Sequence, residues 1–168
     1  MTSKLKVNLI NDSGDNNIIT SDGSGVITSS KFKIGQIVQT VYSTKYASSS
    51  TSYVDVTSVS ITPTSTSSKV LILFVGSFGV GGEDIDAFYQ VQRGNVTLQF
   101  PYHVGDGDIQ ATRSNQSYST TLLDSPSSTS QVTYNLQVKV ASNEIFLNRN
   151  GANDQCGFTT FTVMEVLP

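Results

Sequence analysis

The sequence predicts an all-β protein, built as a sandwich, a jelly roll or a barrel. Short strand-like stretches, separated by Gly-, Ser- and Asn-rich turns, recur at intervals of about 10 residues, a spacing typical of these folds. No apolar periodicity of the helical kind extends beyond one turn. Residues 70–75 are a continuous apolar run, which indicates a strand covered on both faces.

The amino-acid composition limits the class of protein and the kinds of partner that we expect. Charged residues make up 14% of the 168-residue chain, against about 25% in a usual soluble domain. Ser, Thr, Asn and Gln must therefore supply the polar surface, which suits strands and turns. The net charge of −3 and the scattered basic residues predict no nucleic-acid partner. We expect no signal peptide, because no apolar segment of the signal-peptide kind follows the first six residues. We also expect no membrane span, because no apolar run approaches ~18 residues.

Residues 1–33 are predicted to form a separate N-terminal arm. Three short strand patterns lie near residues 5–9, 18–20 and 26–28, with Asp-, Asn- and Gly-rich turns between them. Strands this short cannot bury a core alone, so we expect other chains to hold them. The candidate anchoring residues are the apolar ones of the first two patterns: Leu5, Val7, Leu9, Ile18 and Ile19.

The main domain is predicted to begin at residue 34. A strand is expected over 34–42 and another over 53–62. Within the second strand the apolar residues change phase, which predicts a β-bulge near Thr57. Pro63 ends this strand, since proline has no amide hydrogen for the ladder.

The strand over 69–78 has two apolar faces. Val70, Ile72 and Phe74 point to one side, and Leu71, Leu73 and Val75 to the other. One face fills the core, and the other must be covered by the protein's own loops or by partner chains. We expect an oligomer interface, because monomers rarely expose apolar patches of this size. The pattern leaves open which face lies in the core, so the candidate interface residues are Leu71, Leu73, Val75 and Phe74.

Two hairpins are predicted in the second half of the chain. Residues 87–93 alternate and lead into the turn sequence Gly94–Asn95, after which a return strand begins. Residues 132–140 alternate most clearly, and we expect 144–149 to return beside them as a hairpin. Further strands are expected over 118–123 and 158–167.

Catalytic and metal-binding patterns are weak, and we expect no enzyme and no cofactor. His103 is the single histidine, and no Gly-x-Ser-x-Gly elbow accompanies it. Cys156 is the single cysteine and is expected to be a packed or loop thiol. Two acidic clusters are expected to be solvated loops, with calcium binding as the alternative: Glu83, Asp84 and Asp86, and Asp106 and Asp108.

A possible recognition surface lies in or beside the long loops after residue 100. Tyr and Arg are typical of polar recognition surfaces, and long loops on a rigid scaffold often carry binding sites. The other interpretation is that these residues pack on their own loop stems. The candidate ligand-loop residues are Tyr102, His103, Arg113 and Tyr118.

The order of the strands resembles a known family. A strand ending in Ile61–Thr62–Pro63 precedes the 70–75 run, and residues 136–140 and 160–166 follow. This order is similar to the trimeric jelly-roll domains of the complement C1q and tumour-necrosis-factor type. The resemblance implies a jelly-roll β-sandwich that forms a homotrimer. It also implies that one face of the 70–75 strand meets the trimer axis.

The chain also resembles small tail-fibre, head-fibre and decoration proteins of marine bacteriophages. The segments that carry this likeness are 11–14, 18–26, 123–126, 146–149 and 162–166. The resemblance implies a homotrimer with a short N-terminal arm or shaft (1–33) and a jelly-roll knob (34–168). It does not imply catalysis.

Together these features predict a non-enzymatic, trimeric virion surface protein of a tailed phage, made in the host cytoplasm. It would be a capsid decoration protein or a short fibre whose arm docks on the major capsid protein or on a tail protein. The alternative is a receptor-binding tail-fibre tip that binds a host surface glycan. A glycan depolymerase is the third class, and it would need paired carboxylates ~5–9.5 Å apart.

Overall fold

The computed structural model describes residues 9–15, 17–21, 27–28, 33–82, 85–99, 101–104 and 115–168, and it is all-β over these residues. Its strands are β1 (Leu9–Asn11), β2 (Asn17–Ser21), β3 (Ile27–Thr28), β4 (Ile34–Tyr42), β5 (Tyr46–Ser48), β6 (Val54–Ile61), β7 (Lys69–Val80), β8 (Ala87–Arg93), β9 (Val96–Thr97), β10 (Tyr102–Val104), β11 (Gln116–Asp124), β12 (Val132–Val140), β13 (Ile145–Leu147) and β14 (Thr159–Val166). Among these residues no helix has the length and hydropathy of a membrane span.

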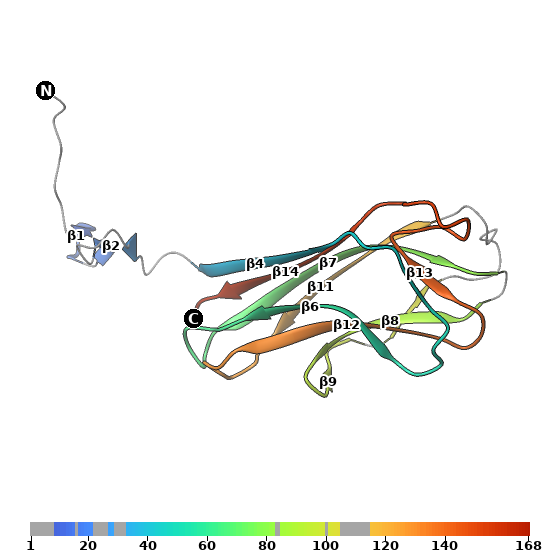
Figure 1. Ribbon diagram of the computed structural model, residues 1–168. Helices are drawn as coiled ribbons and strands as arrows, with labels where there is room; N and C mark the ends of the chain where they lie inside the picture. The colour runs from blue at the N-terminus through green and yellow to red at the C-terminus, as the bar shows by residue number, and fades with distance from the viewer. Residues whose placement is uncertain are drawn as a thin grey trace, which may run out of the picture.

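Two antiparallel sheets form the main body, stacked as two layers (Figure 1). The first, which we call the β7 sheet, has the order β4–β14–β7–β11. The short strand β13 pairs with the part of β7 that extends past β14, and β5 pairs with β13. The second, which we call the β12 sheet, has the order β10–β8–β12–β6, and β9 also pairs with β8.

The strand order identifies the fold as a jelly roll. Numbered along the chain, the eight main strands are β4, β6, β7, β8, β10, β11, β12 and β14. The two sheets then read 1-8-3-6 and 2-7-4-5, which is the order made by two interlocked Greek keys. The prediction of an all-β jelly-roll sandwich is confirmed.

The N-terminal strands β1, β2 and β3 form a small antiparallel sheet that precedes the sandwich (Figure 1). Leu9 lies opposite Thr20, and Ile10 lies opposite Ile19. Leu9 and Ile10 are 43% and 45% exposed, so the sheet buries little of its own apolar surface. Leu5 and Val7, the other predicted anchoring residues of the first strand pattern, lie outside the described residues.

The predicted bulge in β6 is confirmed by its pairing with β12. Thr57 lies opposite Leu136, whereas Asp55 lies opposite Gln137, so Val56 is an extra residue in the ladder. The bulge restores the inward orientation of the apolar side chains after the phase change. As a result, Val54 and Val59 both contact the core although their positions have opposite parity.

One predicted hairpin is confirmed and the other is wrong. β8 pairs with β9 across Gly94, whose φ of 55° favours glycine. In contrast, β12 pairs with β6 and β8, while β13 pairs with β5 and β7 in the opposite sheet. The turn at Asn143 (φ 62°) carries the chain from one sheet to the other. Alternation defines the buried face of a strand and leaves its partner undefined, which is why the pattern suggested a hairpin.

An aromatic cluster joins the two sheets at the centre of the core. The ring of Phe74, in β7, lies 5.3 Å from that of Tyr89 in β8 and 6.0 Å from that of Phe161 in β14, between centroids. Phe78 also packs on Phe74, at 5.9 Å. Gly76 makes room for this cluster, because a Cβ there would lie 2.5 Å from Phe74 Cζ.

Asp124 links the edge strand β11 to the opposite sheet. Its Oδ2 accepts hydrogen bonds from Arg93 Nε and from Tyr134 Oη, both at 2.8 Å. Burial, together with the hydrogen bond to the Asp124 carboxylate, raises the pKa of Tyr134 above its usual range. The hydroxyl therefore stays protonated and continues to donate. This contact holds the edge strand over the core.

Replacing Phe74 by alanine should destabilise the fold strongly. Phe74 is fully buried at the contact between the sheets, and removing such a ring usually lowers the free energy of unfolding by about 3–5 kcal/mol. Denaturant unfolding followed by circular dichroism would measure this loss. Val96→Ala is the control: Val96 is 49% exposed in β9, so its change should stay within about 0.5 kcal/mol. Equal effects of the two substitutions would contradict the central role of Phe74.

Candidate oligomer interface

The outward face of the β7 sheet presents three rows of side chains. Residues opposite one another on adjacent strands point to the same side of a sheet. The pairing of β4, β14, β7 and β11 therefore aligns their outward residues across all four strands. In strand order, the arm-side row is Ile37, Met164, Leu71 and Leu123; the middle row is Gln39, Thr162, Leu73 and Thr121; the far row is Val41, Thr160, Val75 and Ser119.

These rows contain apolar side chains and no charged one. The arm-side row is apolar across all four strands, and its end members Ile37 and Leu123 are 60% and 55% exposed. In the far row, Val41 and Val75 are 55% and 47% exposed. An apolar, uncharged patch that crosses a whole sheet is typical of a contact surface rather than of a surface facing water.

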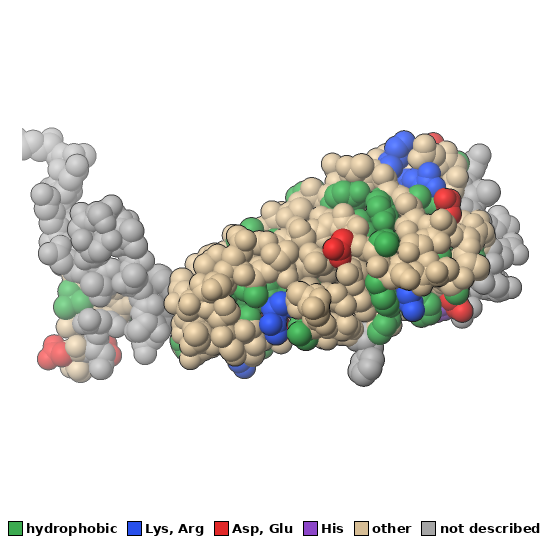
Figure 2. All heavy atoms as spheres, turned by 60° about the horizontal axis from the view of Figure 1, so that its bottom comes forward, with side chains coloured by type: hydrophobic (Ala, Val, Ile, Leu, Met, Phe, Trp, Pro, Cys, Tyr) green, Lys and Arg blue, Asp and Glu red, His purple; other side chains and the backbone are tan. Residues whose placement is uncertain are grey.

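The outward face of the β12 sheet is different, because hydrogen-bonded polar side chains run across it, beside Phe88 and Lys139. Gln90 Nε2 donates to Gln137 Oε1 at 2.7 Å, and Gln137 Nε2 donates to Asp55 Oδ1 at 2.8 Å. Ser60 and Thr133 share a further hydrogen bond of 2.8 Å between their hydroxyls. Figure 2 views the molecule from this side, where uncharged polar side chains and backbone (tan) cover most of the surface. The two outer faces of the sandwich therefore have different chemistry.

The position of β7 decides which of its two apolar faces lies outside. Val70, Ile72 and Phe74 are 0% exposed and form the core. Leu71, Leu73 and Val75 point outward into the three rows. The structure therefore corrects one candidate interface residue: Phe74 has no exposed surface left to bury against another chain, because it packs against the opposite sheet.

A buried carboxylate fastens the arm-side end of this sheet. Glu165, in β14, is 0% exposed. Its Oε1 accepts hydrogen bonds from the Thr64 amide (2.6 Å), Thr64 Oγ1 (2.7 Å) and Ser68 Oγ (2.7 Å), and Oε2 accepts one from Gln36 Nε2 (3.0 Å). The carboxylate thereby joins β4, β14 and the loop after Pro63. It holds these segments together beneath the arm-side row.

The environment of Glu165 also favours its charged form. Burial alone would raise the pKa of the Glu165 carboxyl, but the hydrogen bonds from Gln36, Thr64 and Ser68 outweigh this effect. They hold the pKa below its usual value of 4.5. Sequence patterns could not predict this site, because its four donor groups lie far from Glu165 along the chain.

The candidate ligand-loop residues do not form one surface in the described part of the chain. Tyr118 lies in β11, and its ring packs against Phe78 at 5.8 Å and Tyr89 at 6.1 Å, so its assignment to a ligand loop is corrected. Tyr102 lies in β10, but its side chain, like Arg113, is outside the described residues. His103 remains at the surface, where Nε2 lies 2.8 Å from Asp86 Oδ1.

The acidic clusters and the cysteine give no metal site in the described residues. Within those residues, no group of three or more His, Cys, Asp and Glu side chains could hold a metal ion. Asp86 pairs with His103, and the other acidic candidates, Glu83, Asp84, Asp106 and Asp108, lie outside the described residues. Cys156 is a half-buried thiol in the loop before β14, as its sequence context predicted.

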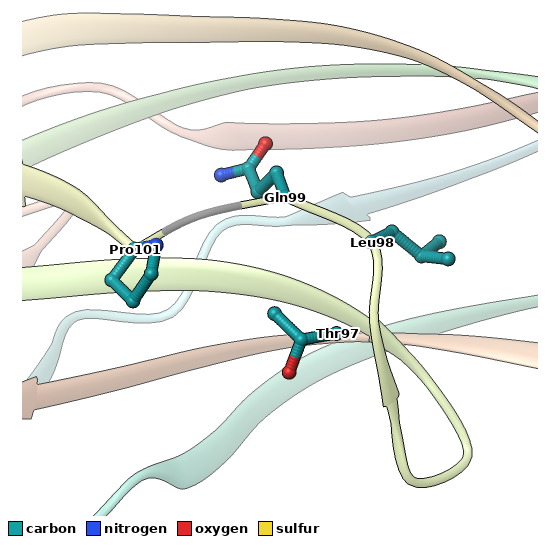
Figure 3. Close-up of a pocket in the computed structure, with 4 residues that line it drawn as sticks. All are labelled: Thr97, Leu98, Gln99 and Pro101. Carbon is teal, nitrogen blue, oxygen red and sulfur yellow. The ribbon is translucent and has the colours of Figure 1, made fainter.

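A small hollow of about 230 Å³ lies at the edge of the β12 sheet, lined by Thr97, Leu98, Gln99 and Pro101. Figure 3 shows that these side chains come from the end of β9 and the segment that leads from it to β10. None of the four is a titratable or nucleophilic group of the kind that acid–base catalysis needs.

Comparison with known proteins finds only distant structural similarity. Neither a protein-family model nor a curated protein matches the chain. The solved structure of infectious bursal disease virus, Gt strain, has a TM-score of 0.44 and 9% identity, over 86% of this chain and 41% of that chain. The VP2 subviral particle of the same virus has a TM-score of 0.43 and 8% identity, over 86% and 41%. The chain thus spans about two fifths of these proteins, and a likeness at these values does not assign a function.

Replacing Glu165 by glutamine should destabilise the protein in a pH-dependent way. Glutamine has nearly the same shape, but it lacks the charge, and its amide N–H groups would face the donors that now bind the carboxylate. We therefore expect the free energy of unfolding to fall by about 1–3 kcal/mol at pH 7. Because the folded-state pKa lies below 4.5, the carboxylate's contribution is complete above that pH. It is lost as the pH falls through the folded-state pKa.

Denaturant unfolding of both proteins between pH 7 and pH 3 would measure this effect. The difference in unfolding free energy should narrow below pH 4.5, the value for the unfolded chain. Glu144→Gln is the matched control, since this carboxylate is 46% exposed and 3.7 Å from Arg149; its effect should be at most about 1 kcal/mol. A wild-type advantage over Glu165→Gln that does not change with pH would contradict the explanation.

Proposed function

We propose that the protein is a non-enzymatic virion structural protein that forms a homotrimer through its β7 sheet. One observation carries the proposal: three adjacent outward rows of this sheet hold no charged side chain, and one of them is apolar across all four strands, whereas polar side chains hydrogen-bond to one another across the opposite outer face. Burial against neighbouring copies removes this apolar surface from water, which is the main driving force for association. The polar β12 sheet then faces the solvent.

The distribution of apolar residues supports a closed ring. Ile37 and Val41 lie on the edge strand β4, and Leu123 lies on the other edge strand, β11. Three inter-strand spacings of about 4.8 Å separate these edges by about 14 Å. In a ring, each copy contacts a neighbour on both sides, so both edges are used. The number three comes from the resemblance to C1q- and tumour-necrosis-factor-type domains.

The arm (1–33) is the part of the chain that we assign to docking. Its described residues expose Leu9 and Ile10 on a three-stranded sheet, and a sheet this small gains stability by packing on another surface. The partner would be the major capsid protein or a tail protein of a tailed phage. The knob (34–168) would then project as a capsid decoration or a short fibre, with its uncharged polar coat in solvent.

The substitution Leu73→Asp should prevent assembly without unfolding the protomer. Leu73 points outward at the centre of the candidate interface, and a carboxylate buried there between chains would lack a charged partner. Sedimentation velocity should show the wild-type oligomer and a monomeric variant. Asn135→Asp is the control, because it adds the same charge on the outward side of β12. An oligomeric Leu73→Asp protein would exclude this face as the interface.

Deletion of residues 1–33 should leave a folded, trimeric knob that no longer joins the particle. The sandwich keeps both of its sheets and its core without the arm, because β4 is the first strand that they include. Circular dichroism and sedimentation would measure folding and assembly, and imaging of whole virions would show where the full-length protein sits. Incorporation of the truncated chain at wild-type levels would mean that the arm is not the anchor.

A further inference from the structure

A polar row crosses the centre of the candidate interface. The middle row holds Gln39, Thr162 and Thr121 around the single apolar residue Leu73. Gln39 Nε2 donates to Thr162 Oγ1 at 2.8 Å, and this bond joins β4 to β14 on the outer surface. The polar row lies between the apolar arm-side row and the partly apolar far row.

This hydrogen bond uses only part of the bonding capacity of the row. An amide side chain offers two N–H donors and a carbonyl acceptor, and a hydroxyl both donates and accepts. Within the described part of the chain, the side chains of Gln39 and Thr121 make no other hydrogen bond. In a single protomer, water can satisfy these groups, because both residues are exposed. In an oligomer that covers the face, they must find partners or lose free energy.

We propose that the middle row hydrogen-bonds to the same row of neighbouring copies and thereby fixes their register and number. The inference rests on the proposed oligomer and deepens it, since it names what aligns the copies. The partner that fits is a second copy of this chain, because amide and hydroxyl groups are donors and acceptors at once. In a closed ring one end of the row on each copy meets the other end of the row on the next copy. Amide and hydroxyl groups can pair in that arrangement, whereas a row of like charges would need an oppositely charged partner.

The apolar rows alone would align the copies poorly. Apolar contact is non-directional, so sliding one copy along another costs little as long as apolar surface stays covered. A slide by two residues, about 6.6 Å along a strand, would place the amide of Gln39 against an apolar row. Its hydrogen-bonding groups would then be buried without partners. A single buried polar position sets register and oligomer state in coiled coils by the same physical effect.

The test is the double variant Gln39→Leu with Thr162→Val, examined by native mass spectrometry and sedimentation velocity. These substitutions keep the approximate size of the side chains and remove the hydrogen-bonding groups. We expect the variant to associate, because more apolar surface is buried, but to form more than one oligomeric species where the wild type forms one.

The matched control is a Gln–Thr pair of the same kind on the opposite sheet. Gln92 Nε2 donates to Thr97 Oγ1 at 3.2 Å between adjacent strands β8 and β9. The double variant Gln92→Leu with Thr97→Val should keep a single oligomeric species. A third variant, Thr162→Ser, retains the hydroxyl and should also keep a single species, which separates hydrogen bonding from packing of the methyl group.

Each outcome decides the question. A single species of wild-type mass for Gln39→Leu with Thr162→Val would overturn the register role and leave the proposed trimer intact. A monomeric double variant would also overturn it, since the row would then supply affinity rather than alignment. Mixed species from Thr162→Ser would attribute the effect to methyl packing and overturn the proposal. A monomeric wild-type protein would instead overturn the proposed function itself.

Discussion

The sandwich depends on β7, a strand that is hydrogen-bonded along both edges and apolar on both faces. β11 pairs along one edge, and β14 followed by β13 pairs along the other. Its inward residues Val70, Ile72 and Phe74 fill the core. Its outward residues provide one position in each of the three rows on the opposite side. The same few residues therefore determine the core of the protomer and the chemistry of the candidate interface.

Two buried carboxylates stabilise the sandwich in addition to its apolar core. Glu165 joins the first and last strands of the sandwich to the loop after Pro63, and Asp124 holds the edge strand β11 to the opposite sheet. Each accepts several hydrogen bonds, which is the condition for burying a carboxylate without a large loss of free energy. Both carboxylates lie in the β7 sheet. Their hydrogen bonds therefore fix the positions of the strands that carry the three outward rows.

The two outer faces of the sandwich differ in chemistry, and this difference connects the structure to the proposed function. On the outer face of the β12 sheet, amide, hydroxyl and carboxylate side chains hydrogen-bond to one another. The β7 sheet presents apolar rows and a polar middle row that is suited to a copy of itself. The proposed particle-bound trimer would use both properties, with one face in the contact between copies and the other in solvent.

The sequence by itself determined the β class, the turn at Gly94, the bulge near Thr57 and the two apolar faces of β7, because these depend on local alternation and on backbone preference. Tertiary structure alone decided that β13 crosses to the other sheet, that Leu71 and Leu73 rather than Phe74 face outward, and that the half-buried ring of Tyr118 packs against the core. It alone also assembled the site of Glu165 and the three outward rows. The physical reason is that alternation specifies which residues share a face of a strand, whereas the neighbours of that face are set by strand pairing between distant segments.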